Sequence, residues 1–238
     1  MNITGAVAFV TGTNRGIGAQ VVKALKARGA AKIYAASRRD TTTEAGVIPV
    51  TLDITKPNEV AAAATLAGDT TLLINNAGVN CNTPLLHPPS EQNARLEMEV
   101  NYFGTLAMCR AFAPLLGANG GGTIVNMLSI LSRVTLPLMG SLCASKAAAL
   151  SLTHGVRAQL AGQGTLVIAV MPGAVDTDMT RDMPPPKMPP SEVAHAVLDA
   201  IEACMEEVYP GAMAQALTER LAQDPKGLEK EFARYLPR

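Results

Sequence analysis

The sequence contains no tryptophan, and aromatic residues make up only 3% of its 238 residues. Histidine occurs three times and cysteine four times, and no pair of cysteines has the CxxC spacing of metal or redox motifs. The cysteines and histidines are spread along the chain, as Cys81, Cys109, Cys143, Cys204, His87, His154 and His195. We therefore expect no disulfide framework and no metal site.

Net charge is also missing, because 20 lysine and arginine residues balance 20 aspartate and glutamate residues. Without an excess of one sign, the chain has no field that attracts nucleic acid or an anionic membrane surface. The apolar segment 6–10 has no basic leader and is too short for the core of a signal peptide, and no run approaches the about 20 residues that span a bilayer. We expect a cytoplasmic protein that binds neither nucleic acid nor membrane.

The chain does have ample material for a core, with 48% hydrophobic and 17% charged residues, and we expect a single domain over residues 1–238. Short apolar runs predict buried strands at 7–11, 32–37, 47–52, 71–75, 122–127 and 166–171. Longer patterns between them predict helices at 17–28, 56–67, 90–112 and 142–160. Alternation of strands and helices indicates an α/β fold, a doubly wound parallel sheet of about seven strands with helices on both faces.

The last quarter of the chain has a different character. Residues 176–190 hold five prolines and three methionines, which excludes a regular helix or a central strand. We predict a surface loop there, which would serve as a lid over a substrate site, with Met179, Met183 and Met188 as an adaptable apolar lining. A helix at 191–205, a short strand at 207–209 and one or two polar helices through 212–235 are expected to follow.

A glycine-rich segment lies between the first strand and the first helix. It contains Gly12, Asn14, Arg15, Gly16, Ile17 and Gly18. Glycines at such a turn let the backbone approach a pyrophosphate, and the helix that begins there offers free N–H groups. The segment predicts a dinucleotide site in a Rossmann-type domain, and the alternative is merely a tight turn between strand and helix.

The end of the second strand bears on the choice of cofactor. A carboxylate there would accept the ribose 2′-OH of NAD, whereas arginine favours the 2′-phosphate of NADP. The chain has Ser37, Arg38 and Arg39 at this position, and Arg15 adds a cation from the glycine-rich segment. NADP(H) is therefore favoured over NAD(H), although Asp40 complicates the choice and the arginines could simply face solvent.

Three further segments complete a resemblance. Asn-Asn-Ala-Gly occupies 75–78, Pro-Gly-Ala-Val-Asp-Thr occupies 172–177, and Gly-Ser-Leu-Cys-Ala-Ser-Lys-Ala occupies 140–147. With the Gly-x-x-x-Gly-x-Gly spacing of 12–18, they make the chain, from residue 5 to about 210, similar to the short-chain dehydrogenase/reductase (SDR) family. The resemblance implies hydride transfer between a nicotinamide cofactor and a carbonyl or alcohol. It also implies cofactor contacts at Asp53, Ile54, Asn75, Ala77, Gly78, Lys146, Pro172, Gly173, Val175 and Thr177.

The resemblance implies a catalytic asparagine, serine, tyrosine and lysine. Asn101 matches the asparagine, and Lys146 matches the lysine that binds the nicotinamide ribose. Ser129 precedes position 142 by thirteen residues, the family's usual distance between serine and tyrosine, with Ser132 as a weaker candidate. The alternative for Ser129 is a hydroxyl at a strand end that bonds only to backbone.

Position 142 departs from the family, because it holds leucine instead of tyrosine. Leu142 has no proton to donate, and loss of a positioned general acid costs roughly 10²–10⁴-fold in rate. Tyr102 and Tyr34 lie in other elements and do not replace it. Three hypotheses follow: a silenced or redirected enzyme, an NADP(H)-binding sensor or scaffold, or an enzyme for imine or iminium substrates that need hydride alone.

The resemblance also suggests where a small-molecule carbonyl, alcohol or imine would bind and how the chain assembles. We expect a substrate pocket near Leu131, Pro137, the segment 173–175 and the lid at about 176–190. Family members commonly form homotetramers or homodimers through the helices predicted at 90–112 and 142–160. The alanine-rich faces of these helices suit such an interface, and they would equally suit packing within one chain.

Overall fold

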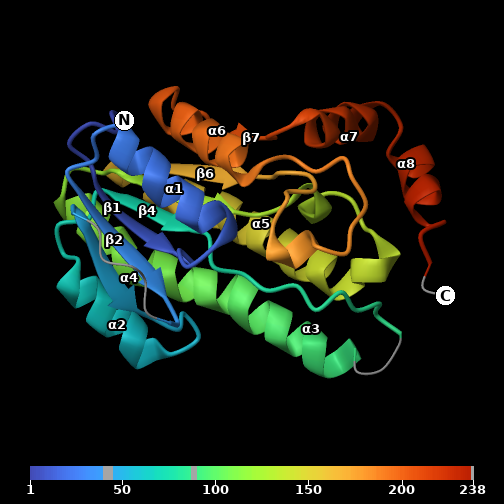
Figure 1. Ribbon diagram of the computed structural model, residues 1–238, viewed down its shortest axis with the longest axis horizontal. Coiled ribbons are helices and arrows are strands. Elements are labelled where there is room, and N and C mark those ends of the chain that lie inside the picture. The colour runs from blue at the N-terminus through green and yellow to red at the C-terminus, as the bar shows by residue number, and fades with distance from the viewer. Residues whose placement is uncertain (40–44, 87–89, 237–238) are drawn as a thin grey trace.

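The computed structural model describes residues 1–39, 45–86 and 90–236 (Figure 1). Asp40 and His87 lie outside the described residues. Seven parallel strands form one sheet in the order β3-β2-β1-β4-β5-β6-β7. They are β1 (Val7–Thr11), β2 (Lys32–Ser37), β3 (Val47–Thr51), β4 (Leu72–Asn75), β5 (Thr123–Met127), β6 (Leu166–Val170) and β7 (Glu207–Val208). The predicted doubly wound parallel sheet is thereby confirmed.

The central strands are buried along their length because both faces of the sheet are covered. Every residue of β4 and β5 is buried, as expected for parallel strands between two helical layers. β1 pairs with both β2 and β4, so that Val10 lies between Ala35 and Ile74. The edge strand β3 differs: it contains a proline, and only Val47 and Val50 of its five residues are buried.

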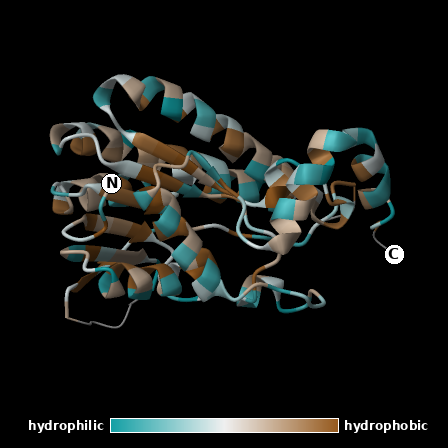
Figure 2. Ribbon diagram, turned by 90° about the horizontal axis from the view of Figure 1, so that it is seen from above, coloured by the Kyte–Doolittle hydropathy of each residue, from teal (hydrophilic) through white to brown (hydrophobic). Residues whose placement is uncertain are grey.

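Helices cover both faces of the sheet (Figures 1 and 2), and a large hydrophobic cluster lies between the sheet and each helical layer. On one face, α1 (Gly16–Ala27) and α6 (Pro190–Glu202) contribute Val21, Leu25, Val197 and Ile201. The other face is covered by α2 (Pro57–Leu66), α4 (Thr105–Ala118) and α5 (Gly140–Leu160). The rings of Phe9 and Phe112 meet there at a centroid distance of 4.7 Å.

The helix predicted at 90–112 is longer and interrupted. It consists of α3 (Ser90–Met98), a π-helical turn Glu99–Gly104 and α4, which ends at Ala118. The π turn contains Asn101. It also brings Gly104 so close to Ile54 that a Cβ at Gly104 would lie 2.7 Å from that side chain. Periodicity along the sequence predicted the helix but not the turn, which inserts one residue into the helical repeat.

Beyond the carboxyl ends of the strands, the C-terminal segments gather on the right in Figure 1. The predicted lid loop contains one 3₁₀ turn, Asp178–Thr180, and Val175 forms an isolated bridge with Met188. After β7 come α7 (Ala212–Gln223) and α8 (Pro225–Phe232). Within the described ranges, each helix is either too short or too polar to cross a membrane.

Candidate functional site

A cleft of about 690 Å³ opens at the carboxyl ends of the parallel strands. It lies next to β1, where the chain order reverses across the sheet, which is the position where doubly wound folds bind ligands. Most residues predicted for the site line this cleft. They are Gly12, Asn14, Arg15, Gly16, Ile17, Ser37, Arg38, Arg39, Asp53, Ile54, Ala77, Gly78, Ser129, Leu142, Lys146, Pro172, Gly173, Val175 and Thr177.

The glycine-rich turn is held rigidly by backbone contacts. A Cβ at Gly18 would lie 2.2 Å from the carbonyl oxygen of Gly12, so only glycine fits there. The side-chain amide of Asn76 donates to the carbonyl oxygens of Thr11 and Gly12, each at 3.0 Å, and ties the turn to the end of β4. Because no side chain caps α1, its first N–H groups remain available for an anion such as a pyrophosphate.

The charged end of the cleft lies at the ends of β2 and β3. Arg38 and Arg39 line it together with Asp53. Burial alone would raise the pKa of Asp53, but hydrogen bonds from Thr55 and the charge of Arg38 hold that pKa below its ordinary value. Arg15 forms an ion pair with Asp178 of the lid at 2.9 Å. The arginine predicted beside the cofactor phosphate therefore joins the glycine-rich turn to the lid in this structure.

Two predicted cofactor residues lie away from the cleft wall. Gly18 packs behind the turn, and Asn75 is buried in β4, where its amide donates to Asn126 Oδ1 of β5 at 2.9 Å. Side chains along a strand alternate in direction, so Asn76, the residue after the strand, lines the cleft instead. Asn75 is a structural link between neighbouring strands.

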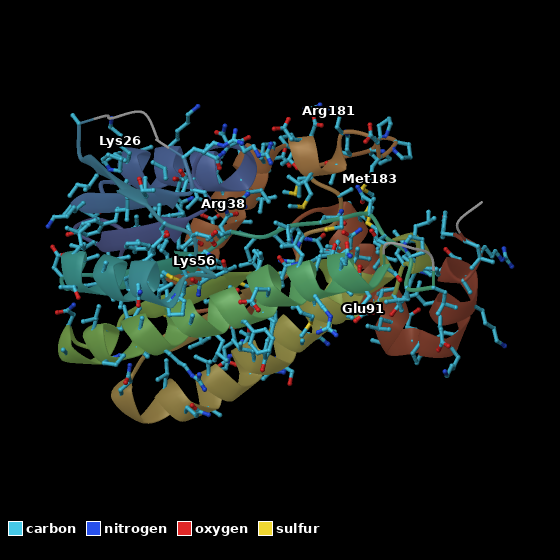
Figure 3. The ribbon with its side chains drawn as sticks, turned by 90° about the horizontal axis from the view of Figure 1, so that it is seen from below. Lys26, Arg38, Lys56, Glu91, Arg181 and Met183 are labelled. Atoms are coloured by element: carbon cyan, nitrogen blue, oxygen red, sulfur yellow. The ribbon has the colours of Figure 1, made fainter. Side chains whose placement is uncertain are left out.

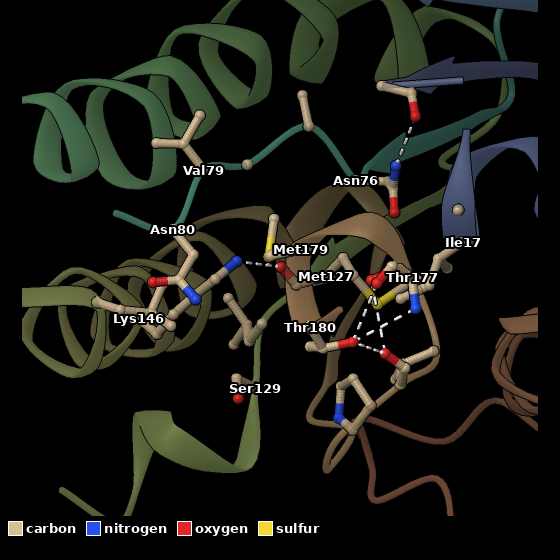
Figure 4. Close-up of a pocket in the computed structure, with 18 of the residues that line it drawn as sticks. Ile17, Asn76, Val79, Asn80, Met127, Ser129, Lys146, Thr177, Met179 and Thr180 are labelled. Carbon is tan, nitrogen blue, oxygen red and sulfur yellow. Dashed lines mark hydrogen bonds between the residues drawn. The ribbon is translucent and has the colours of Figure 1, made fainter. Parts of the chain in front are cut away.

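Lys146 extends from α5 along the cleft wall (Figure 4). Its Nζ donates to the carbonyl oxygen of Met127 at 2.9 Å. Burial lowers the pKa of Lys146 to about 8, against the opposing charge of Glu97. Leu142 lies one helical turn earlier, with 6% of its surface exposed, and lines the same cleft.

Ser129 follows β5 and caps a 3₁₀ turn, where its Oγ accepts a hydrogen bond from the N–H of Leu131 at 3.1 Å. This hydrogen bond to the backbone is the kind that the alternative interpretation of Ser129 predicts. It does not occupy the hydroxyl proton, which stays available to a ligand in the cleft. Ser132, the weaker candidate, is buried and is not part of the described cleft lining.

Asn101 supports the cleft wall from behind. Its side chain accepts from the Val79 N–H at 2.9 Å and donates to the Val79 carbonyl at 3.0 Å and to Ser145 Oγ at 2.9 Å. A Cβ at Gly78 would lie 3.1 Å from Asn101 Oδ1 and 3.6 Å from Lys146 Nζ. Because Gly78 has no side chain, the segment that forms the cleft wall can lie close to both Asn101 and Lys146.

The cleft also has an apolar part, whose residues come from segments far apart in the sequence. It contains Leu131, Leu136, Met139, Leu142, Met179, Met183, Met213, Leu217 and Phe232. Met183 lies on the lid loop beside Arg181 (Figure 3). Of the residues predicted here, Pro137 and Met188 do not line the cleft, and Met188 packs against the core below α6 instead.

Helices α7 and α8 were missed as parts of the site, because they were interpreted only as polar helices. Met213 and Leu217 are four residues apart in α7 and so share one face of it, and this spacing is the signal that could have revealed them. In the described part of the lining there is no tyrosine, and no cluster of metal-binding side chains occurs among the described residues.

Comparison with known proteins gives these features a context. The model of the short chain dehydrogenase family matches residues 6–187. The chain is 32% identical over 223 residues to the short chain dehydrogenase mpl6 of Monascus purpureus, covering 86% of this chain and 74% of that protein.

Solved structures also resemble the fold, and two of them hold a nicotinamide cofactor. A short chain dehydrogenase from Burkholderia cenocepacia in complex with NADP is 52% identical, with a TM-score of 0.94 and full coverage of both chains. An SDR from Burkholderia phymatum in complex with NAD is 24% identical, with a TM-score of 0.82 over 95% of this chain and 96% of that one, and it supports the fold alone. The protein belongs to the short-chain dehydrogenase family of oxidoreductases.

Proposed function

We propose that the protein binds NADP(H) and transfers hydride between its nicotinamide and a small apolar carbonyl or alcohol, and that Leu142 slows this reaction on ketones. One observation carries the proposal: Ser129, Lys146 and Leu142 line one cleft, and Asn101 supports its wall. The resemblance to the family assigns its proton donor to position 142. The other catalytic residues are intact, which favours a silenced or redirected enzyme over a sensor.

The residues fit the cofactor along the whole cleft. The uncapped N-terminus of α1 would hold the pyrophosphate, and Asp53 and Ile54 would lie beside the adenine. Arg38 and Arg39 would bind a 2′-phosphate, which supports NADP(H) over NAD(H). The relative that is 52% identical holds NADP, whereas the one that is 24% identical holds NAD.

The chain's own groups would orient the reactants. When bound, the cofactor supplies or accepts the hydride. Lys146 would hold the nicotinamide ribose with N–H donors left over from its bond to Met127, and the Ser129 hydroxyl would polarise the substrate oxygen. Leu142 cannot give that oxygen a proton, so ketone reduction would lack its general acid.

A second candidate, hydride transfer to a carbon–nitrogen double bond, has a specific observation in its favour. The wall around Leu142 is apolar, and an iminium substrate arrives with its proton already attached. Such a substrate needs positioning and a dry cleft rather than a proton donor.

We also propose a homodimer or homotetramer that is located in the cytoplasm. The exposed Leu96 and Phe103 on the α3 and π-turn surface support pairing through the long helix. The four cysteines are free, which fits a reducing compartment.

The decisive experiment compares this chain with its Leu142→Tyr variant. Fluorescence titration with NADPH and NADH comes first, and we expect both proteins to bind NADPH more tightly. Single-turnover oxidation of NADPH is then followed with a panel of ketones and cyclic imines. We expect the tyrosine variant to reduce ketones about 10²–10⁴-fold faster.

Other outcomes separate the alternatives. Imine reduction by the leucine form would identify the redirected enzyme. Binding of NADPH with no turnover by either protein would contradict the carbonyl reductase and support the sensor or scaffold.

A further inference from the structure

Glu97 is the only charged side chain that is fully buried among the described residues, with 0% of its surface exposed. It lies in α3, one helical turn before Asn101, so the two side chains share a face of the long helix. It does not line the cleft. A buried carboxylate without a role is costly, because the charged form loses its hydration.

Only one of the two carboxylate oxygens of Glu97 accepts a hydrogen bond from a described residue. Oε1 accepts from the N–H of Cys81 at 2.7 Å and holds the strand segment that lines the cleft at Val79 and Asn80. Oε2 accepts no hydrogen bond from any described residue. A glutamine could make the Cys81 bond through its carbonyl oxygen without carrying a charge, so the bond does not explain the carboxylate.

The charge of Glu97 acts on three ionisable groups, two thiols and one amine. Burial, and then the charge of Glu97, raises the pKa of Cys81 and contributes to the raised pKa of Cys143. Neutral thiols gain nothing from a neighbouring carboxylate. Lys146 is the one cation in the group, and Glu97 is the charge that opposes the loss of its proton.

Lys146 has unused hydrogen-bonding capacity. Its amine has three N–H donors and makes one bond within the protein, to Met127. Asn101, one helical turn after Glu97, lies near this amine, since Asn101 Oδ1 and Lys146 Nζ are 3.1 and 3.6 Å from the Cβ position of Gly78. Glu97 makes no hydrogen bond or ion pair to Lys146 in the described part of the structure, so it acts on the amine through its field.

We propose that Glu97 is the buried counter-charge of Lys146 and a positioning residue for the reaction, because it keeps the Lys146 amine charged inside the cleft wall. The role rests on the proposed function, in which a charged Lys146 holds the ribose. The role of Glu97 matters more because position 142 is leucine: without a tyrosine there, Lys146 is the only ionisable group that α5 presents to the cleft.

The test measures the ionisation of Lys146 itself. The protein is labelled with ¹³C at the lysine ε-carbon, without cofactor, and its NMR signals are followed from pH 6 to 11. Lys146→Met identifies the signal by its absence. The charged form of Lys146 is lost as pH rises through its pKa, and Glu97→Gln should move that midpoint down by about one pH unit, a tenfold change in the proton equilibrium.

Glu99→Gln is the matched control, because Glu99 lies in the same helix but is exposed. It should leave the midpoint within about 0.2 units, since charges in water are screened. An equal midpoint in Glu97→Gln and Glu99→Gln would overturn the proposal. The titration needs no turnover, so its failure is separate from a failure of Leu142→Tyr to reduce ketones.

If Glu97→Gln unfolds too readily for the titration, the double variant Glu97→Gln/Lys146→Met decides. It should unfold at a higher temperature than Glu97→Gln, because the uncompensated cation has been removed. A double variant that is no more stable than Glu97→Gln would reject the pairing, because glutamine keeps the Cys81 bond and the lost stability would then have no connection with Lys146.

Discussion

The two ends of the cleft are built by different means. At the cofactor end, backbone atoms, glycines and the Asn76 amide fix the wall, and side-chain volume is excluded by contacts such as that of Gly18 with Gly12. At the substrate end, apolar side chains from the lid, α7 and α8 fill the wall, and many of them are partly exposed. The difference teaches that the cofactor end permits little substitution, whereas the substrate end can change residue by residue.

The largest effect is expected at the cofactor end. Gly18→Ala places a methyl group where the Gly12 carbonyl lies, and backbone cannot move aside as a side chain can. We expect a loss of about 3 kcal/mol or more in the free energy of unfolding, together with loss of NADPH binding. Chemical denaturation and fluorescence titration measure both.

Gly162→Ala is the control, because nothing lies within 4 Å of its Cβ position and its φ is not positive. Its stability should stay the same or rise slightly. If Gly18→Ala were equally harmless, the view that the cofactor end excludes side-chain volume would be wrong.

An intermediate effect is expected at the substrate end. Phe232→Ala removes a partly buried ring from the wall, and we expect about tenfold weaker saturation by an apolar ketone with unchanged NADPH affinity. The half-saturation constant for the ketone is measured by stopped-flow hydride transfer in the Leu142→Tyr background. Leu236→Ala, which alters an exposed side chain outside the cleft lining, should leave this constant unchanged. Weakened NADPH binding by Phe232→Ala would contradict the separation of the cleft into a cofactor end and a substrate end.

The smallest effect is expected where the two ends meet, at Arg15 and Asp178. Both side chains are exposed, so Asp178→Asn should speed NADPH release only about two- to threefold, and salt should mimic it in the unmodified protein. Stopped-flow release at low and high salt measures this. Asp182→Asn, also exposed on the lid, serves as control, and slower release from Asp178→Asn would mean that the freed Arg15 binds the cofactor instead.

Change of pH should not loosen this contact near neutrality. Hydrogen bonds from Arg181 and Arg15 lower the pKa of Asp178 below its ordinary value. A carboxylate with a depressed pKa stabilises the folded state above its unfolded pKa of about 4, and the effect is lost only as pH falls through the folded value. NADPH release should therefore not change between pH 6 and 7 on account of Asp178.

The same contrast explains what the sequence could predict. β1 and β2 have the predicted bounds, and the glycine-rich turn lies where its motif placed it, because local backbone chemistry determines both. The place of Phe232 in the cleft could not be predicted, since it depends on how α7 and α8 fold back over the cleft. The spacing of Met213 and Leu217 indicates an apolar face of α7, but it does not say what that face covers. The role of Glu97 was missed as well, because an acidic residue in a polar helix gives no sign of burial.

The π turn has a consequence for how this helix could change over time. It adds one residue to a helical repeat of 3.6, so its loss by a single-residue deletion would rotate α3 by about 100° relative to α4. Such a deletion would swing Glu97 and Asn101 away from Lys146 while Phe112 and Leu116 stayed in the core. Deletion of a single residue would therefore leave a helix that still packs in the core but no longer carries Asn101 to the cleft wall.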